Sequence, residues 1–229
     1  MVINSSNDQK LQKAEQELSK LGEVHRMAGD LSTKDVIDKL VSSTTEIFGG
    51  IDVLAYVTGS PAPGTVMEKS YEDWEAGARL LTVSPSYLGR RVAEVMINNK
   101  IKGKLVFSSS VTVREPNPTL ALSNVCRISI QGLVRTLSRE LAPHGIRVNS
   151  VLPGFIKTAR IDQLVANNAK RKGISEAQAL TEFVAQIPMG YIGSTEEIAR
   201  TFLYLGSDMS SYVSGASIPV DGALLHSIG

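Results

Sequence analysis

The chain has 229 residues, a length that suits one domain or at most two and allows a sizeable core. Its 42% hydrophobic and 21% charged residues are ordinary globular usage, and a net charge of +1 argues against a nucleic-acid partner. Cys126 is the single cysteine, which excludes an internal disulfide, and no apolar run reaches the length of a membrane span. We therefore expect a cytoplasmic protein with neither a membrane nor a nucleic-acid partner.

Strand-like and helix-like segments alternate along the whole chain. The predicted strands lie, in chain order, at residues 2–4, 24–28, 51–57, 104–109, 146–152 and 217–220. The predicted helices lie at roughly 7–21, 32–48, 74–98, 120–141 and 195–205, and Pro85 should kink or restart the third. Such alternation is typical of an α/β protein with a doubly wound parallel sheet. Ligands bind such sheets at the carboxyl ends of the strands, so the loops after those ends should carry the site.

Several short motifs resemble, in order and spacing, those of the short-chain dehydrogenase/reductase family, classical type. They are Asp30-Leu31, resembling the adenine-contacting pair; Gly59, resembling the last residue of the Asn-Asn-Ala-Gly motif; Ser110, resembling the catalytic serine; Pro153-Gly154 with Thr158, resembling the nicotinamide-side motif; and Val220-Asp221-Gly222, resembling the C-terminal signature. The resemblance spans nearly the whole chain. It implies one Rossmann-like domain over residues 1–229, with a lid at about 159–186. The apolar residues of that segment suggest two amphipathic helices.

The resemblance also implies a nicotinamide cofactor, either NAD or NADP. The residues it places around that cofactor are Ser5, Ser6, Asp30, Leu31, Gly59, Arg127, Pro153, Gly154, Ile156 and Thr158. Family members that prefer NAD tend to carry an acid at the end of the second strand. Ser5 and Ser6 stand there instead, which slightly favours NADP.

The start of the chain departs from the family pattern. The family opens with a strand and a glycine-rich turn whose N–H groups approach the pyrophosphate. No such turn occurs here, and residues 2–4 already resemble the family's second strand. The first strand lies inside the family's sheet, so its loss would leave two ladders unpaired. We favour a truncated or wrongly started chain over a natural loss.

The expected active site departs as well. The family's Tyr-x-x-x-Lys falls on Ser123 and Arg127, and its helix asparagine falls near Leu81 or Thr82, so Ser110 alone is retained. The candidate catalytic residues are Ser110, Ser123 and Arg127. A serine hydroxyl is a much weaker acid than a phenol, and an arginine is a fixed cation that cannot readily relay a proton. Tyr56 is an alternative proton donor, although a packing role is favoured.

Two functional hypotheses remain open. The first is an atypical nicotinamide-dependent oxidoreductase acting on a small alcohol or carbonyl substrate. The alternative is a non-catalytic family member kept as a binding or scaffolding protein. No metal site is expected, because His25, His144 and His226 lack ligand spacing.

The family commonly assembles through its two long helices, so a homodimer or homotetramer is expected. In the helix over 120–141, Val125 is assigned to the side that faces the sheet. Ile128 and Ile130 are assigned to the partner subunit.

Overall fold

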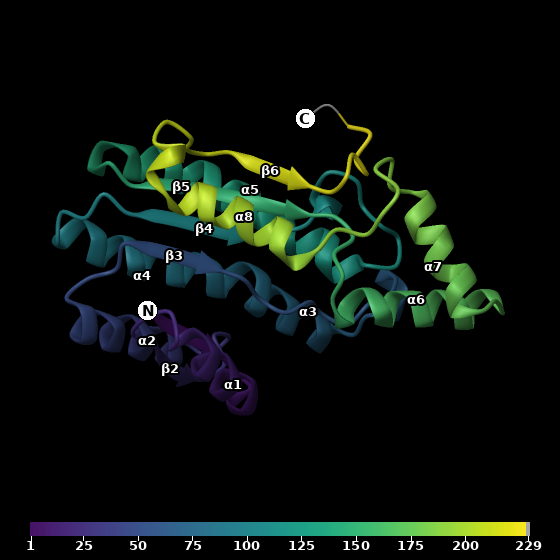
Figure 1. Cartoon of the computed structure of the whole chain (residues 1–229), viewed down its shortest axis with the longest axis horizontal. Coiled ribbons are helices and arrows are strands. Elements are labelled where there is room, and N and C mark those ends of the chain that lie inside the picture. The colour runs from purple at the N-terminus through teal and green to yellow at the C-terminus, as the bar shows by residue number, and fades with distance from the viewer. Residues whose placement is uncertain (228–229) are drawn as a thin grey trace.

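A computed structural model describes residues 1–227 as an α/β fold (Figure 1). Its strands are β1 (Val2–Ser5), β2 (His25–Ala28), β3 (Val53–Tyr56), β4 (Lys104–Ser108), β5 (Arg147–Pro153) and β6 (Ser217–Val220). Every ladder between neighbouring strands is parallel. The predicted class, a doubly wound parallel sheet of the Rossmann type, is confirmed.

Helices cover both faces of the sheet. They are α1 (Asp8–Leu18), α2 (Lys34–Phe48), α3 (Tyr71–Ala78), α4 (Ser84–Asn98), α5 (Ala121–Leu141), α6 (Ala159–Lys172), α7 (Glu176–Ala185) and α8 (Thr195–Gly206). In Figure 1, α8 lies in front of the strands β3 to β6, and α4 and α5 lie behind them. Among residues 1–227, no helix is long and apolar enough to cross a membrane.

The central strands β4 and β5 are buried on both faces. Their side chains form the middle of the core, with Leu105, Phe107, Val148 and Leu152 fully enclosed. Helices cover both faces of these strands and exclude water from them. The side chains on both faces are therefore apolar, and the two segments are near-continuous apolar runs in the sequence.

The sheet is divided into two parts. The strands β1 and β2 form one pair, and β3, β4, β5 and β6 form a four-stranded sheet in that order. Within residues 1–227, no strand bonds to the outer edge of β1 or to that of β3. Val53 and Val57 at this edge of β3, and Leu203 on the neighbouring helix α8, are exposed. Within the described residues, the β1–β2 pair and the four-stranded sheet are therefore not joined by a ladder.

Helix α2 joins the two parts through side chains. Ile37 and Val41 are buried in the same core cluster as the residues of α4. On the rim of this contact, Asp38 accepts hydrogen bonds from the Tyr87 hydroxyl at 2.9 Å and from Arg91 Nε at 2.7 Å. The β1–β2 pair is therefore attached to the larger sheet by helix packing and not by a ladder.

A π-helical turn, Arg79–Val83, separates α3 from α4. The Ser84 N–H donates to the Arg79 carbonyl, five residues back. The next donor in that pattern is Pro85, which has no N–H, so the Leu80 carbonyl is left without a backbone partner. The Tyr56 hydroxyl donates to it instead, at 3.1 Å. The predicted restart near Pro85 is confirmed, and β3 supplies the group that stabilises it.

Helices α6 and α7 pack against each other beyond the ends of the strands (Figure 1). They share a small cluster of their own, formed around the buried Ile161, Val165, Ala169 and Ala179. This cluster is distinct from the main core. Both amphipathic helices predicted for the lid are thus present, and their role as a lid stays a prediction.

Two assignments on α5 are wrong. Val125 is 54% exposed and does not face the sheet, whereas Ile130 is 2% exposed and lies in the core. Residues two apart on a helix point in nearly opposite directions, so Ile128 and Ile130 cannot share a face. Ile128, three residues after Val125, is also 54% exposed, as expected.

Candidate active site

Arg127 occupies the centre of the candidate site. Its side chain projects from α5 and is 5% exposed. Nη2 donates to the Gly59 carbonyl at 3.1 Å, and Nη1 donates to the Ser109 carbonyl at 3.4 Å. These carbonyls follow β3 and β4, so the guanidinium spans the carboxyl ends of two neighbouring strands. This is the edge of the sheet at which a doubly wound fold binds its ligands.

The serines predicted for catalysis lie around the same strand end. Ser110 follows β4, and its Oγ accepts hydrogen bonds from Thr112 N at 3.2 Å and from Thr112 Oγ1 at 3.1 Å, so it caps the short 3₁₀ turn Val111–Val113. Ser123 is buried on α5 one turn before Arg127. Within residues 1–227, the Ser123 hydroxyl has no hydrogen-bond partner. The structure therefore brings two of the three candidates onto one helix face and leaves one hydroxyl uncommitted.

The Arg127 charge is not balanced by an acid. In residues 1–227, no carboxylate oxygen lies within 4 Å of its guanidinium. Burial is the main cause that lowers the pKa of Arg127 to about 10; Tyr56 opposes this shift and the charge of Arg160 adds to it. A group with that pKa keeps its positive charge at neutral pH. The site is therefore electropositive.

Tyr56 is poorly suited to donate a proton. Its ring is 3% exposed, and its hydroxyl is engaged by the Leu80 carbonyl. Burial raises the pKa of Tyr56 to about 12. A donor for catalysis at neutral pH needs a lowered pKa and access to the substrate. The geometry therefore favours the packing role.

The residues predicted to hold the adenosine half lie side by side on the β1–β2 pair. Ser5 is in register with Ala28, and the Gly29 N–H donates to the Ser5 carbonyl at 3.0 Å. Ser5, Ser6, Asp30 and Leu31 therefore follow adjacent strand ends. Asp30 Oδ1 accepts from the Ser32 N–H at 2.8 Å, and its other oxygen accepts no hydrogen bond from residues 1–227.

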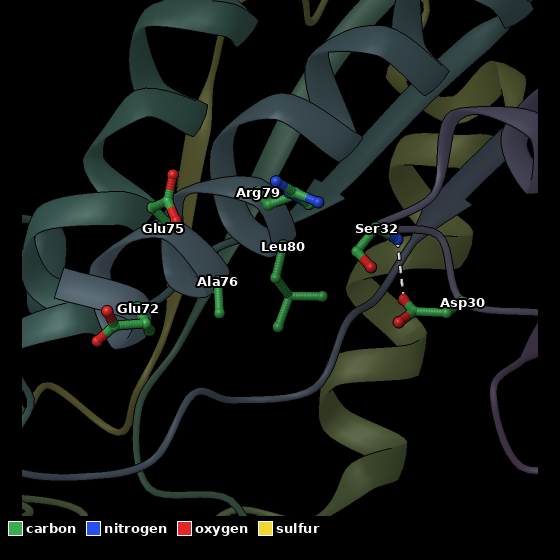
Figure 2. A pocket seen from close by; sticks show the side chains of 7 residues that line it. All are labelled: Asp30, Ser32, Glu72, Glu75, Ala76, Arg79 and Leu80. Atoms are coloured by element: carbon green, nitrogen blue, oxygen red, sulfur yellow. Dashed lines mark hydrogen bonds between the residues drawn. The ribbon is translucent and has the colours of Figure 1, made fainter. Parts of the chain in front are cut away.

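A hollow of about 420 Å³ opens beside Asp30 (Figure 2). Its wall is formed by the Asp30 loop and by the helical stretch around Arg79, and its lining residues are Asp30, Ser32, Glu72, Glu75, Ala76, Arg79 and Leu80. None of the three candidate catalytic residues lines it. The hollow thus lies beside two of the residues predicted to hold the adenosine half, Asp30 and its loop, and away from the candidate catalytic residues.

The Pro153-Gly154 turn and the C-terminal signature form one structure. The Gly154 N–H donates to the Val220 carbonyl at 3.0 Å. A Cβ at Gly154 would lie 2.8 Å from Asp221, which explains why glycine is needed there. Two motifs recognised separately in the sequence are therefore in contact.

The loop after this turn leads into α6. Ile156 forms a parallel bridge with Gly193. The Thr158 hydroxyl donates to the Ile156 carbonyl at 3.2 Å, and Thr158 immediately precedes the first residue of α6. The predicted residues of this loop thus lie beyond the end of β5, next to the strand end that Arg127 contacts.

A nicotinamide dinucleotide fits the two ends of this site. At one end, the uncommitted Asp30 oxygen can accept a hydrogen bond from an adenine amino group. At the other, a Cβ added at Gly59 would meet no atom within 4 Å, so space is open beside Arg127. The glycine-rich turn that would approach the pyrophosphate does not occur in the sequence.

Arg160 is a half-buried cation of the predicted lid that the sequence motifs did not single out. It lies in the first turn of α6, and burial lowers its pKa. The missed signal was its spacing: it stands two residues after Thr158, at the start of the predicted lid. Ser109 was also not predicted. It accepts the Arg127 hydrogen bond through its backbone carbonyl, and every residue type has such a carbonyl, so a sequence motif does not identify it.

Fold and strand-end site together define a doubly wound protein of the Rossmann type, and comparison with known proteins identifies the family. Residues 1–224 match the family described as enoyl-(acyl carrier protein) reductase. The chain is 31% identical over 227 residues to a glucose 1-dehydrogenase of Gluconobacter oxydans, covering 98% of this chain and 82% of that protein. The chain belongs to the short-chain dehydrogenase/reductase family.

Solved structures agree with this assignment. YwfH, an NADPH-dependent reductase involved in bacilysin biosynthesis, superposes with a TM-score of 0.92 at 29% identity, covering 99% of this chain and 89% of that one. The L-sorbose reductase of Gluconobacter frateurii, complexed with NADPH and L-sorbose, also gives a TM-score of 0.92, at 26% identity, and covers 99% of this chain and 87% of that one. The fold of these relatives is thus preserved over nearly the whole of this chain.

Proposed function

We propose that the protein is an atypical NADP- or NAD-dependent oxidoreductase that interconverts a small alcohol and its carbonyl compound. The observation that carries this proposal is Arg127, a buried cation held by the Gly59 and Ser109 carbonyls at the ends of β3 and β4. NADP is favoured over NAD, because Ser5 and Ser6 place no acid at the end of β1 and two related reductases use NADPH.

The chemistry divides between cofactor and protein. A bound nicotinamide supplies or accepts the hydride. Arg127 fixes a positive charge where a carbonyl oxygen becomes negative, and Ser110 and Ser123 can donate hydrogen bonds to that oxygen. Neither serine is acidic enough to surrender its proton, so we expect protons to arrive from water and the turnover to be slow.

The cofactor would be held by the groups already described. Asp30 and Leu31 would contact the adenine, Ser5 and Ser6 its ribose, and Pro153, Gly154, Ile156 and Thr158 the nicotinamide side. Gly59 leaves room for the chain between them, and Arg127 would also reach the ribose hydroxyls. The bound substrate would be a small molecule enclosed by α6 and α7.

The alternative is a non-catalytic protein that kept the shape and lost the chemistry. Its support is the replacement of the family's tyrosine and lysine by Ser123 and Arg127. A folded binding or scaffolding protein would keep the cofactor-side residues and need no proton donor.

One experiment separates these functions. NADPH binding is first measured by fluorescence titration, and a panel of aldehydes and ketones is then followed by nicotinamide absorbance. We expect turnover of at least one compound and a lower rate for Ser110→Ala. A protein that binds NADPH but turns over no compound would contradict the enzymatic proposal and support the alternative.

A further inference from the structure

Residues 221–227, which follow β6, cross the end of the sheet where the site lies. They begin beside the turn after β5, since a Cβ at Gly154 would lie 2.8 Å from Asp221. The Gly222 carbonyl then accepts from the Met189 N–H at 3.2 Å, in the turn that follows α7. Figure 1 shows this yellow segment beyond the arrowhead of β6, on the side of the molecule that carries α7. The segment, which we call the strap, therefore passes from the loop after β5 to the α6–α7 unit.

The far end of the strap is held by Glu115. One carboxylate oxygen, Oε1, accepts from the His226 N–H at 2.6 Å and from the Ser227 N–H at 2.7 Å. Hydrogen bonds to a carboxylate are stronger than those to a neutral acceptor. The Glu115 N–H donates to the Val111 carbonyl at 3.2 Å, so this carboxylate is anchored to the turn that Ser110 caps. The strap is thus tied to the turn of a candidate catalytic serine.

The strap holds a conformation that a free chain would seldom adopt. Ala223 has a φ of 66°, in the left-handed region that residues other than glycine rarely occupy. Asp221 fixes this turn: its Oδ1 accepts from the Ala223 N–H at 3.1 Å, and its Oδ2 accepts from the Leu225 N–H at 3.0 Å. Backbone strain of this kind persists only where the surrounding contacts maintain it, and it clusters at ligand clamps. Two carboxylates, one at each end, therefore hold the strap in one path.

We propose that the strap encloses the substrate end of the site and that Glu115 is a positioning residue, whose carboxylate keeps the strap closed over Ser110. This inference rests on the proposed function, because it adds a wall to the pocket that α6 and α7 would enclose. Three contacts along the strap carry it: Gly154 on the predicted nicotinamide side, Met189 after α7, and Glu115 at the far end. A segment that closes over a site in this way sequesters the reacting groups from water.

A thiol placed at the reacting end reports whether the strap covers it. In Ser110→Cys, the rate of reaction with dithiodipyridine measures access to the thiol, and the buried Cys126 of the parent protein gives the background rate. We expect Glu115→Ala, added to Ser110→Cys, to speed this reaction about tenfold or more, because the strap loses both of its charge-assisted hydrogen bonds. Glu115→Gln keeps an oxygen acceptor and should give a smaller increase. Glu140→Ala, which removes the same charge from an exposed position near the end of α5, should give none.

A second variant releases the strap from its other end. Asp221→Ala removes the acceptors of the Ala223 and Leu225 N–H groups and leaves the Ser110 turn untouched. It should therefore also speed the reaction of the thiol, whereas an effect confined to the turn would appear in the Glu115 variants alone. Hydrogen exchange of the amides of residues 222–227, resolved by mass spectrometry, should quicken in Glu115→Ala and in Asp221→Ala.

The thiol rates decide the inference without a known substrate. A thiol that reacts no faster with Glu115→Ala than in Ser110→Cys alone would overturn it, and so would an increase that Asp221→Ala does not reproduce. For any carbonyl compound that the parent protein turns over, Glu115→Ala should raise KM by a larger factor than it lowers kcat, because the strap encloses the substrate and supplies no proton; an unchanged KM would also overturn the inference. A protein that shows the expected thiol rates but turns over no compound would contradict the proposed function and keep the strap, so the two failures are distinguishable.

Discussion

Arg127 combines a structural and an electrostatic role, and substitution separates the two. Arg127→Lys keeps a charge that can reach ribose hydroxyls, whereas Arg127→Ala removes the charge and leaves the Gly59 and Ser109 carbonyls without their donor. We expect the alanine variant to weaken NADPH binding by about tenfold more than the lysine variant. Fluorescence titration measures this, and equal affinities of both variants and the parent would contradict a role at the cofactor.

Ser123 offers a test of whether the site can be restored. Ser123→Tyr places a phenol one turn from Arg127, whose charge should lower the pKa of that phenol and make it a better proton donor. We expect a higher reductase rate with any substrate that the parent turns over, measured by NADPH consumption. Ser123→Phe is the matched control, since it adds the same bulk without the hydroxyl. A tyrosine variant no faster than the phenylalanine variant would show a site rebuilt for other chemistry.

The π turn between α3 and α4 depends on a residue from a distant strand. Tyr56→Phe removes the hydroxyl that satisfies the Leu80 carbonyl, and that carbonyl has no backbone donor because Pro85 lacks an N–H. We expect the free energy of unfolding to fall by about 1–3 kcal/mol. Urea denaturation measures the change, with the exposed Tyr71→Phe as a control that should have no effect. Equal stability of both variants would show that water replaces the hydroxyl.

A structural element could be predicted from the sequence where the residues that cause it lie close together along the chain. The strands were predictable because β4 and β5 are buried on both faces and read as apolar runs, and Gly154 was predictable because a short motif carries it. The π turn was predicted only as a restart, since its stabilising group, Tyr56, is distant in sequence. A contact between residues so distant in sequence forms only in the folded chain, so a local pattern does not reveal it.

Helix α5 presents the surface most suited to assembly. Val125 and Ile128 lie one turn apart and are exposed, and Gly132, one further turn along, leaves open space for a close neighbour. We expect at least a homodimer with a two-fold axis across this helix, burying well over about 1,000 Å². Light scattering at micromolar concentration should give a dimer or tetramer for the parent.

The matched variants sharpen the assembly prediction. Ile128→Glu should give a monomer, because it places a charge in the apolar contact. Met67→Glu, at a still more exposed apolar residue on the short turn Val66–Glu68, should leave the assembly unchanged. A parent protein that is monomeric while folded would refute the prediction.

The division of the sheet has a consequence for how the molecule opens. A continuous sheet melts as one cooperative body, whereas within residues 1–227 no ladder joins the β1–β2 pair to the other strands, and α2 attaches the pair by packing on α4. Local opening of such a unit costs less than global unfolding. Amides of β1 and β2 should therefore exchange with deuterium well before those of β4 and β5, as resolved by mass spectrometry of peptic fragments. Equal protection of the amides of both parts against exchange would instead show that the α2–α4 contact is enough to make the two parts unfold as one cooperative unit.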